Sequence, residues 1–332
     1  MGSVVHRSGS ARNRGQLTDL KCYRTLERYR PIVPVPNTAS TFEAHRDRLL
    51  RLAYGMLGEV SRAEDVVQDA YLRWDDVDPE TVDDPDAYLS TIVTRLCLDE
   101  LTSARAEREE YTGPWLPEPV VAEGARPDAE IEETSELSMA LLVLLDELRP
   151  IERAVYVLRK AFDRPYAEIA RHVDRTEAHC RKIAQRTRTR IDANGNSINA
   201  PPAAHAELLT QFVDALEARD PEALTEVLAE DVTHLTDGGE VKEAAKRPIE
   251  GAERVQRFLL SISEKTGDDL RVRPAYVNGR PGLLAVQDDR VHSVWGLRVV
   301  NGQIQELYCV RNPEKLRHLD RSPIDERDRT PH

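Results

Sequence analysis

The 332-residue sequence has few cysteines, few aromatic residues and no long apolar run. Cys22, Cys97, Cys180 and Cys309 lie far apart and form neither a CxxC pair nor a cluster with histidine. Disulfide frameworks and structural zinc sites need such spacings, so neither a disulfide nor a metal or other cofactor is expected. Without an apolar segment of roughly 20 residues or a signal-peptide core, the chain is expected to be cytoplasmic and not to bind a membrane.

The sequence also lacks net positive charge. It carries 59 Asp and Glu residues against 46 Lys and Arg residues, which gives a net charge of −13. A protein that coats nucleic acid would be basic. Any contact with DNA must therefore come from local basic faces, and the chain should bind DNA weakly when alone, or only together with a larger partner.

A helix-turn-helix pattern covers residues 166–191. Tyr166, Ile169 and Ala170 form an apolar stripe with helical spacing, and Thr176 can cap a second helix. Asp174 stands in the turn, where aspartate tolerates positive φ. The inward face of the second helix consists of Cys180, Ile183, Ala184, Thr187 and Ile191.

The outward face of this second helix is basic. Between Arg181 and Arg190 there are five basic residues and no acidic one. A short helix, a turn and a basic helix match the plan of a DNA-binding helix-turn-helix, although an ordinary helical hairpin with a solvated face has the same pattern. The candidate DNA-binding residues are Thr176, His179, Arg181, Lys182, Gln185 and Arg186.

Two helices are predicted near the start of the chain. An apolar pattern begins near Thr41 and ends at Gly58, and a second helix covers Ser61–Trp74. Ser61 and Glu64 have the spacing of a capping box. Periodicity leaves one polar face on the second helix, and solvation alone could explain that face: Glu64, Asp65, Gln68, Asp69 and Arg73.

The segment Ser61–Trp74 resembles the core-polymerase-binding helix in region two of extracytoplasmic-function sigma factors. The Ala-Glu-Asp-Val-Val-Gln-Asp run closing in Leu-Arg-Trp carries the resemblance. Pro85–Asp99 resembles the helix that reads and melts the minus-ten promoter element, and residues 166–191 then fall where region four belongs. The resemblance implies core RNA polymerase and promoter DNA as partners, with Tyr88, Arg95 and Arg105 added to the DNA-binding candidates.

A proline-rich acidic segment joins the two regions. Pro114, Pro117, Pro119 and Pro127 predict extended backbone. Trp115 between prolines is typical of an anchor on a neighbouring surface, with an incidental tryptophan in a surface turn as the alternative.

The C-terminal third predicts an α+β domain. Two amphipathic helices, a strand and a third helix precede strands joined at Asn278-Gly279, Asp288-Asp289 and Asn301-Gly302, which are good hairpin signals. The pattern resembles the SnoaL-like cone, which is a curved sheet wrapped on helices around an internal pocket.

The combination resembles sigma factors of the sigma-J type. Trp-Leu-Pro-Glu-Pro stands at 115–119, Asp-Gly-Gly at 237–239 and Asn-Pro-Glu-Lys at 312–315. The family's Asp-Gly-Gly-Gly-Lys motif is broken here after the second glycine. The resemblance implies regulation within the chain, without a dedicated anti-sigma protein, through Trp115, Leu116, Pro117, Asp237, Gly238, Gly239, Asn312, Pro313 and Lys315.

The predicted organisation is multidomain, with two all-α domains followed by the α+β domain. The predicted segments are a disordered tail at 1–39, region two at 40–110, a linker at 111–136, region four at 137–193, a linker at 194–202, the SnoaL-like domain at 203–319 and a tail at 320–332.

The SnoaL-like fold hosts enzymes, so a small-molecule enzyme or ligand sensor with a helical interaction module is the alternative function. A third hypothesis is a protein that sequesters polymerase without reading DNA. No spacing pairs the polar groups of the C-terminal domain, so no catalytic residue and no enzyme activity is predicted, although a small-molecule ligand in its pocket stays open. Those groups are Asp231, His234, Asp237, Tyr276, His292, Trp295 and Tyr308.

Overall fold

The computed structural model describes residues 38–111, 113–122, 137–194, 201–239, 244–265 and 269–319. The predicted C-terminal tail lies wholly outside these ranges, and only Thr38 and Ala39 of the predicted N-terminal tail lie inside them. Most of the two predicted linkers and Lys242 also lie outside the description.

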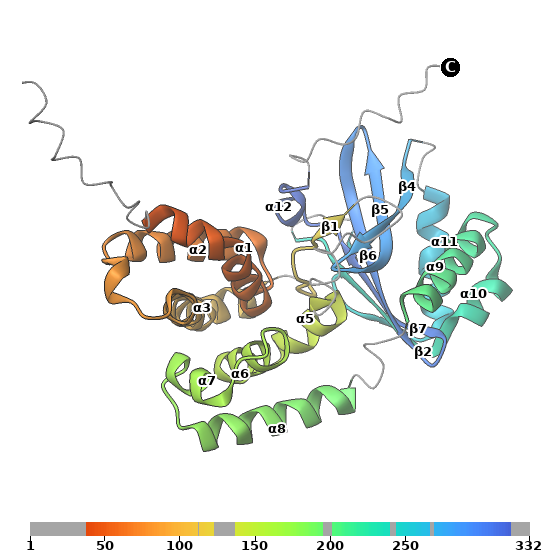
Figure 1. The fold of residues 1–332 in the computed structure, drawn as a ribbon. Coiled ribbons are helices and arrows are strands. Elements are labelled where there is room, and N and C mark those ends of the chain that lie inside the picture. The colour runs from red at the N-terminus through yellow and green to blue at the C-terminus, as the bar shows by residue number, and fades with distance from the viewer. Residues whose placement is uncertain are drawn as a thin grey trace, which may run out of the picture. The chain divides into compact units, whose positions relative to one another are not determined.

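The first helical domain contains three α-helices. They are α1 (Thr38–Leu57), α2 (Val60–Asp75) and α3 (Pro85–Glu110), with a short 3-10 helix, η3 (Pro79–Thr81), before α3 (Figure 1). Helix α1 begins before the predicted start near Thr41 and stops where Gly58 takes a φ of 74°. Glycine adopts this left-handed conformation at little cost, so the predicted stop is confirmed.

The capping box predicted for α2 is wrong. Helix α2 begins at Val60, and its N-cap residue, Glu59, makes no side-chain capping bond. Ser61 lies inside the first turn, and its hydroxyl donates to Glu118 of the distant linker. The spacing of Ser61 and Glu64 carried no information about a cap supplied from elsewhere in the chain.

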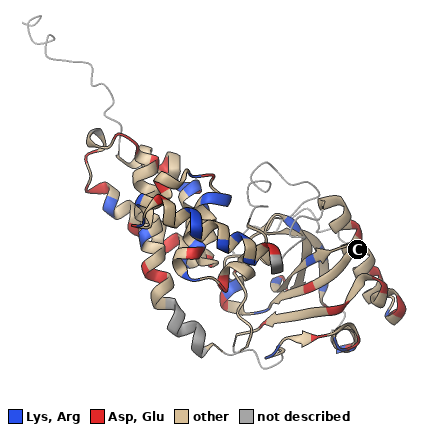
Figure 2. Ribbon diagram, turned by 90° about the horizontal axis from the view of Figure 1, so that it is seen from below, with Lys and Arg blue, Asp and Glu red and all other residues tan. Residues whose placement is uncertain are grey.

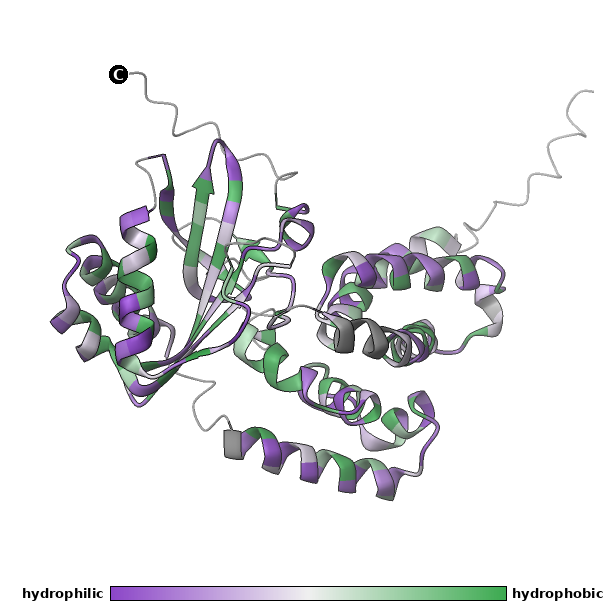
Figure 3. Cartoon of the chain, turned by 180° about the vertical axis from the view of Figure 1, so that it is seen from behind, coloured by the Kyte–Doolittle hydropathy of each residue, from purple (hydrophilic) through white to green (hydrophobic). Residues whose placement is uncertain are grey.

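The second helical domain contains α5 (Met139–Asp146), α6 (Pro150–Lys160), α7 (Tyr166–His172) and α8 (Glu177–Asn194). Asp174 has a φ of 51°, and the Thr176 hydroxyl accepts from the His179 amide at 3.3 Å. The predicted turn and cap are therefore confirmed. Figure 3 shows hydrophilic and hydrophobic bands alternating along α8, as its sequence pattern predicts.

The two helical domains share one hydrophobic core. Buried side chains from α1, α2 and α3 join those of α5, α6, α7 and α8 in a single cluster, in which Trp74 and Leu142 are fully buried. Deep inside it the Arg153 side chain pairs with Asp146 at 3.2 Å. The two predicted all-α domains are thus packed against each other.

The C-terminal domain begins with α9 (Pro202–Glu217) and α10 (Pro221–Val227), and α11 (Ala252–Lys265) follows its first strands. The strands are β2 (Leu228–Asp237), β3 (Ile249–Glu250), β4 (Arg271–Val277), β5 (Arg280–Gln287), β6 (Arg290–Val300) and β7 (Gln303–Val310). Helix α12 (Pro313–Leu316) follows. The predicted α+β architecture is confirmed.

The sheet has the strand order β1-β4-β5-β6-β7-β2-β3. Among the strands that the structure describes, only β2 and β7 pair in parallel. The edge strand β1 (Val121–Ala122) comes from the linker and pairs antiparallel with the end of β4. Register shifts in β5–β6 and β6–β7 are bulges of the kind that bend a sheet, which agrees with the curved sheet predicted.

The sheet is covered on both faces. Helices α9, α10 and α11 pack on one face, where Leu283 and Leu297 join their core (Figure 1). The neighbouring Leu284 faces the opposite way, into a second cluster with Leu116 of the linker and Met139 of α5. Because successive side chains of a strand point to opposite faces, the sheet has one hydrophobic core on each face. The second core attaches the helical half of the chain to the sheet.

The predicted hairpin turns are confirmed. Asn278 and Gly279, Asp288 and Asp289, and Asn301 and Gly302 all have positive φ. Two successive residues with positive φ form the tight turn that suits antiparallel strands.

Candidate functional site

The polar face of α2 is a continuous exposed surface. The opposite side of the helix, including Val66 and Trp74, is buried in the core of the first helical domain. All five predicted polymerase-binding residues are exposed, and we call them the α2 face: Glu64, Asp65, Gln68, Asp69 and Arg73. The structure thus brings together, on one helix, a set that is mainly acidic. Figure 2 shows residues of both charges spread over the helices, while the strands are mostly uncharged.

An exposed apolar residue, Leu72, lies among the residues of the α2 face, and the sequence pattern did not predict a binding role for it. Leu72 is 58 % exposed, which is high for a large hydrophobic side chain. It lies one position before Arg73 on the same helix. Large exposed apolar groups framed by polar residues are common in protein interfaces. The sequence signal that could have identified Leu72 is that it is apolar but lies outside the inward-facing apolar stripe of α2.

The predicted DNA-binding residues lie on two helices. Tyr88 and Arg95 are on α3 and exposed, whereas the side chain of Arg105 lies outside the described residues. The Tyr88 ring centroid lies 5.8 Å from that of the buried Trp74. On α8 and the turn before it, the predicted set is exposed throughout: Thr176, His179, Arg181, Lys182, Gln185 and Arg186.

The basic residues of α8 differ in their contacts. Arg181 pairs with Glu177 one turn earlier and lies 5.2 Å from the Tyr166 ring centroid. Arg188 pairs with Asp192. Within the described part of the chain, Lys182 and Arg186 form no ion pair, so their charges are the most available to a phosphate or a base edge.

The two helical domains meet at a polar contact between α3 and α7. Asp86 on α3 accepts from Arg48 at 2.8 Å and from Arg164, just before α7, at 2.5 Å. Arg164 also donates to Ser90 and pairs with Glu168 at 3.0 Å. We call this cluster, together with His172 and Thr91, the α3–α7 contact. It covers part of the helix that carries Tyr88 and Arg95.

His172 completes the α3–α7 contact. Its Nδ1 lies 2.6 Å from the Thr91 hydroxyl of α3, and its Nε2 lies 3.2 Å from Glu168. Burial lowers the pKa of His172, against the opposing effect of the Glu168 carboxylate. The Thr91 hydroxyl also lies 2.7 Å from the Ala87 carbonyl, to which it donates its single proton, so the direction of its bond to Nδ1 depends on the imidazole tautomer.

A buried joint ties the linker to the C-terminal domain. The Asp237 carboxylate accepts from the Leu116 amide at 2.8 Å, from Lys315 Nζ at 2.8 Å and from the Tyr111 hydroxyl at 2.5 Å. Asn312 donates to the same hydroxyl at 2.9 Å. Burial, followed by the contact with Asp237, raises the pKa of Tyr111, so this phenol stays protonated and donates. We call these five residues the buried joint.

Lys315 makes several contacts with the linker. Besides Asp237 it donates to the Leu116 carbonyl, and its ammonium lies 4.0 Å from the Trp115 ring centroid and 5.3 Å from that of Tyr111. A desolvated cation over an indole face is a strong cation–π contact. The predicted anchoring of Trp115 is therefore present in the structure.

The remaining predicted interdomain residues surround this joint. Gly239 has a φ of 56°, and a Cβ there would stand 2.8 Å from the Asn312 side chain. Pro117 is buried, and Pro313 opens α12 behind the Asn312 cap. Gly238 links Asp237 to Gly239. The three sequence motifs thus meet at one place.

A second set of buried bonds was not predicted. The Tyr54 hydroxyl of α1 donates to the Glu118 carbonyl at 2.7 Å, and Asn278 Nδ2 donates to that hydroxyl at 2.6 Å. Asn278 also donates to the Leu137 carbonyl and exchanges backbone and side-chain bonds with Val120. Asn278 therefore joins both helical domains to the sheet. The Asn278-Gly279 pair predicted only a hairpin turn. The local pattern did not indicate that the Asn278 side-chain amide bonds to both helical domains.

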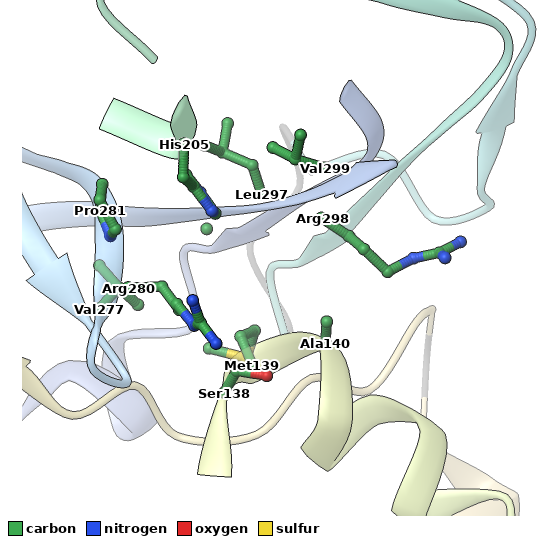
Figure 4. Close-up of a pocket in the computed structure, with 11 residues that line it drawn as sticks. Ser138, Met139, Ala140, His205, Val277, Arg280, Pro281, Leu297, Arg298 and Val299 are labelled. Atoms are coloured by element: carbon green, nitrogen blue, oxygen red, sulfur yellow. The ribbon is translucent and has the colours of Figure 1, made fainter. Parts of the chain in front are cut away.

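A small cavity lies between α5 and the sheet. Its volume is about 20 Å³, room for about one water molecule. Figure 4 shows His205 and Arg280 pointing toward this space, while Arg298 extends away from it. Burial, followed by the charge of Arg280, lowers the pKa of His205 to about 4. This cavity is too small for an organic ligand.

Comparisons with known proteins agree with this arrangement. The Sigma-70 region 2 model matches residues 41–107, and the Sigma-70 region 4 model matches residues 138–191. The chain is 37 % identical over 305 residues to the ECF RNA polymerase sigma factor SigJ of Mycobacterium tuberculosis, covering 88 % of this chain and 96 % of that protein. The chain is an ECF RNA polymerase sigma factor.

A further relative and a crystal structure of SigJ support the same family. This sigma factor is 30 % identical over 280 residues to the probable ECF sigma factor SigI of the same organism, covering 84 % of this chain and 94 % of that protein. It matches the crystal structure of M. tuberculosis SigJ with a TM-score of 0.69 at 33 % identity, over 83 % of this chain and 97 % of that one. This match confirms the predicted fold class over 83 % of this chain.

The α2 face of the sigma factor lies inside the first matched region, α3 and α8 each begin inside a matched region and end just beyond it, and the buried joint lies outside both. No helix within the described ranges combines the length and apolarity needed to cross a membrane.

Proposed function

We propose that this sigma factor binds core RNA polymerase through the α2 face. The observation that carries the proposal is a row of five exposed polar or charged residues, together with Leu72, on a helix whose other side is buried. Acidic groups speed encounter with a basic partner surface, and an exposed leucine supplies apolar contact. On this reading α3 reads and opens the minus-ten element, and α8 reads the minus-thirty-five element.

Charge reversal on α2 tests the docking role. Asp65→Lys and Asp69→Lys should weaken binding to purified core polymerase at least about tenfold, because each places a cation where a basic partner surface is expected. The matched control is Glu43→Lys, which makes the same change at an exposed position of α1. Equal affinity of all three variants, measured by fluorescence anisotropy, would contradict the assignment. Promoter-dependent run-off transcription by the wild type is the required positive result.

Alanine substitution on α8 tests DNA reading. Lys182→Ala or Arg186→Ala should cost about 1–3 kcal/mol in holoenzyme binding to its promoter if the side chain contacts a base edge. Arg188→Ala is the control on the same helix, since Arg188 already pairs with Asp192. If the three variants leave promoter binding equally unchanged, the chain acts on polymerase without reading DNA.

We propose that the structure is a closed form, regulated in cis by the C-terminal domain. Elements at minus ten and minus thirty-five lie about 25 base pairs apart, which is roughly 85 Å at about 3.4 Å per base pair. His172 of α7 lies 2.6 Å from Thr91 of α3, so the two reading domains touch. They must separate to read both elements, and the buried joint restrains the linker between them.

Opening the α3–α7 contact tests this regulation. Arg164→Ala removes the cation shared by Asp86 and Glu168 and should raise transcription several-fold at limiting sigma factor. Lys160→Ala is a control, because Lys160 is an exposed cation of α6 within the second helical domain. Removal of the chain after residue 200 should also change activity. Lower transcription from Arg164→Ala, with its fold intact, would overturn the closed-form proposal.

We also propose that the C-terminal domain is not an enzyme. Its polar candidates are engaged elsewhere: Asp237 in the buried joint, Asp231 with Gln305, and His234 stacked between Phe258 and Trp295. The sigma factor should act in the cytoplasm, without a dedicated anti-sigma protein, because the restraint lies within the chain.

A further inference from the structure

Glu118 of the linker contacts the first turn of α2 with its side chain. One carboxylate oxygen accepts from the Val60 amide at 2.7 Å and from the Ser61 amide at 3.1 Å, and the other accepts from the Ser61 hydroxyl at 3.1 Å. The residue at the N-cap position, Glu59, makes no such bond. A helix normally receives these bonds from a residue next to it in sequence, whereas Glu118 lies 58 residues from Val60.

The backbone of Glu118 is held by the same turn. Its amide donates to the Gly58 carbonyl at 2.9 Å, and its carbonyl accepts from Tyr54 at 2.7 Å. Glu118 is 5 % exposed. The turn between α1 and α2 therefore recognises one linker residue by its amide, its carbonyl and its carboxylate. A surface residue that merely passes this turn would not have all three groups engaged.

The negative charge of Glu118 is favourable at the N-terminus of α2. The first-turn amides of a helix carry partial positive charge, and a carboxylate there is stabilising. Helix α2 has 16 residues and no other acid in its first turn. Its N-terminal half carries Glu64 and Asp65 of the α2 face. The order of that half thus depends on a group that comes from the linker.

We propose that Glu118 is the N-terminal cap of the polymerase-docking helix and a positioning residue for polymerase binding. It stabilises α2 without touching polymerase itself. The position of the linker thereby determines whether the helix that carries the α2 face is ordered for binding. The inference rests on the proposed docking role of that face. It adds that a linker displaced from the α1–α2 turn leaves α2 with an uncapped first turn.

Hydrogen exchange on the full-length protein tests the cap. Glu118→Ala should speed exchange of the amides at residues 60–64 about 3- to 30-fold, which is the range of a lost N-cap. Glu118→Gln keeps the size of the side chain and one acceptor oxygen, so its effect should be intermediate. Exchange in α11 serves as an internal measure of global stability and should not change.

Glu59→Gln is the matched control for this experiment. It alters an acid at the N-cap position itself, which makes no side-chain capping bond but pairs with Arg62 at 3.1 Å, so exchange at residues 60–64 should change less than in Glu118→Ala. A larger effect from Glu59→Gln than from Glu118→Gln, or no effect from Glu118→Ala, would overturn the assignment of the cap.

Affinity for core polymerase tests the coupling. Glu118→Ala should weaken binding several-fold and Glu118→Gln less, in the same order as the exchange rates. If α2 loses protection but affinity is unchanged or higher, the cap exists and the positioning role is wrong. If neither the wild type nor any variant binds core polymerase, the proposed docking function fails, while the exchange result still decides the cap.

Discussion

The buried joint and the α3–α7 contact both hold separate parts of this chain together, but they differ in burial and in the reach of their bonds. In the joint, Asp237 is 0 % exposed and Lys315 7 %, and their partners come from the linker and the end of the chain. In the α3–α7 contact, Asp86 is 19 % exposed and Arg164 12 %. Water and salt reach the second contact more readily, so it should open first and the joint should persist.

The largest effect is expected from breaking the joint. Lys315→Ala leaves the Asp237 carboxylate buried without its cation, which typically costs about 3–5 kcal/mol; the remaining donors, Tyr111 and Leu116, favour the lower end. Denaturant unfolding measures the loss. Arg317→Ala is the control, because its pair with Glu314 is exposed and should be worth less than about 1 kcal/mol. Similar losses from both variants would remove the proposed difference in burial.

A smaller loss is expected at Asn278. Asn278→Ala removes the donor to Tyr54 and Leu137, which should cost about 1–3 kcal/mol. Asn301→Ala is a close control, because Asn301 has the same φ of 51° in an exposed hairpin turn. Subtracting its effect removes the cost of placing alanine at positive φ. A difference near zero between the two variants would show that the interdomain bonds contribute nothing to stability.

The smallest effect should be the pH dependence of the α3–α7 contact. Burial lowers the pKa of His172, with Glu168 opposing and Arg164 and Arg171 reinforcing the shift, while the neutral Thr91 faces it from α3. The unfolded chain then binds more protons, so stability should fall as pH drops below about 6.5. His172→Gln should flatten this dependence in thermal unfolding of the full chain. A steeper dependence in the variant would contradict the assignment.

His205 and His234 provide a reference for that measurement. Burial lowers the pKa of each to about 4, and both lie in the C-terminal domain. They should add a pH-dependent loss of stability between about pH 6.5 and 4 that His172→Gln leaves in place.

Local patterns predicted most of the fold. Gly58, Asp174 and Asn301 were identified correctly because their conformations depend on neighbours in sequence. The motifs at 115–119, 237–239 and 312–315 were predicted from family resemblance to act together, and the structure places them in contact. Their regulatory role stays a prediction.

Distant pairings were beyond the reach of sequence patterns. The cap of α2 was assigned to Ser61 because the true partner, Glu118, lies in another segment. The value of Asn278 as a donor to Tyr54 was hidden for the same reason, since 224 residues separate them. The addition of linker residues Val121 and Ala122 to the sheet likewise has no local signal, because any short extended segment could pair there.

The span of the buried joint has a consequence for synthesis of the protein. Lys315 and the Leu116 carbonyl that it contacts lie 199 residues apart. At about 5–20 residues per second, a ribosome needs roughly 10–40 s to make that stretch. Helix α3 ends at Glu110 and helix α8 at Asn194, so both helices that carry the promoter-reading surfaces are made before Lys315, the lysine that holds the linker. Each newly translated molecule therefore passes through an unlocked interval before the last strand and α12 emerge.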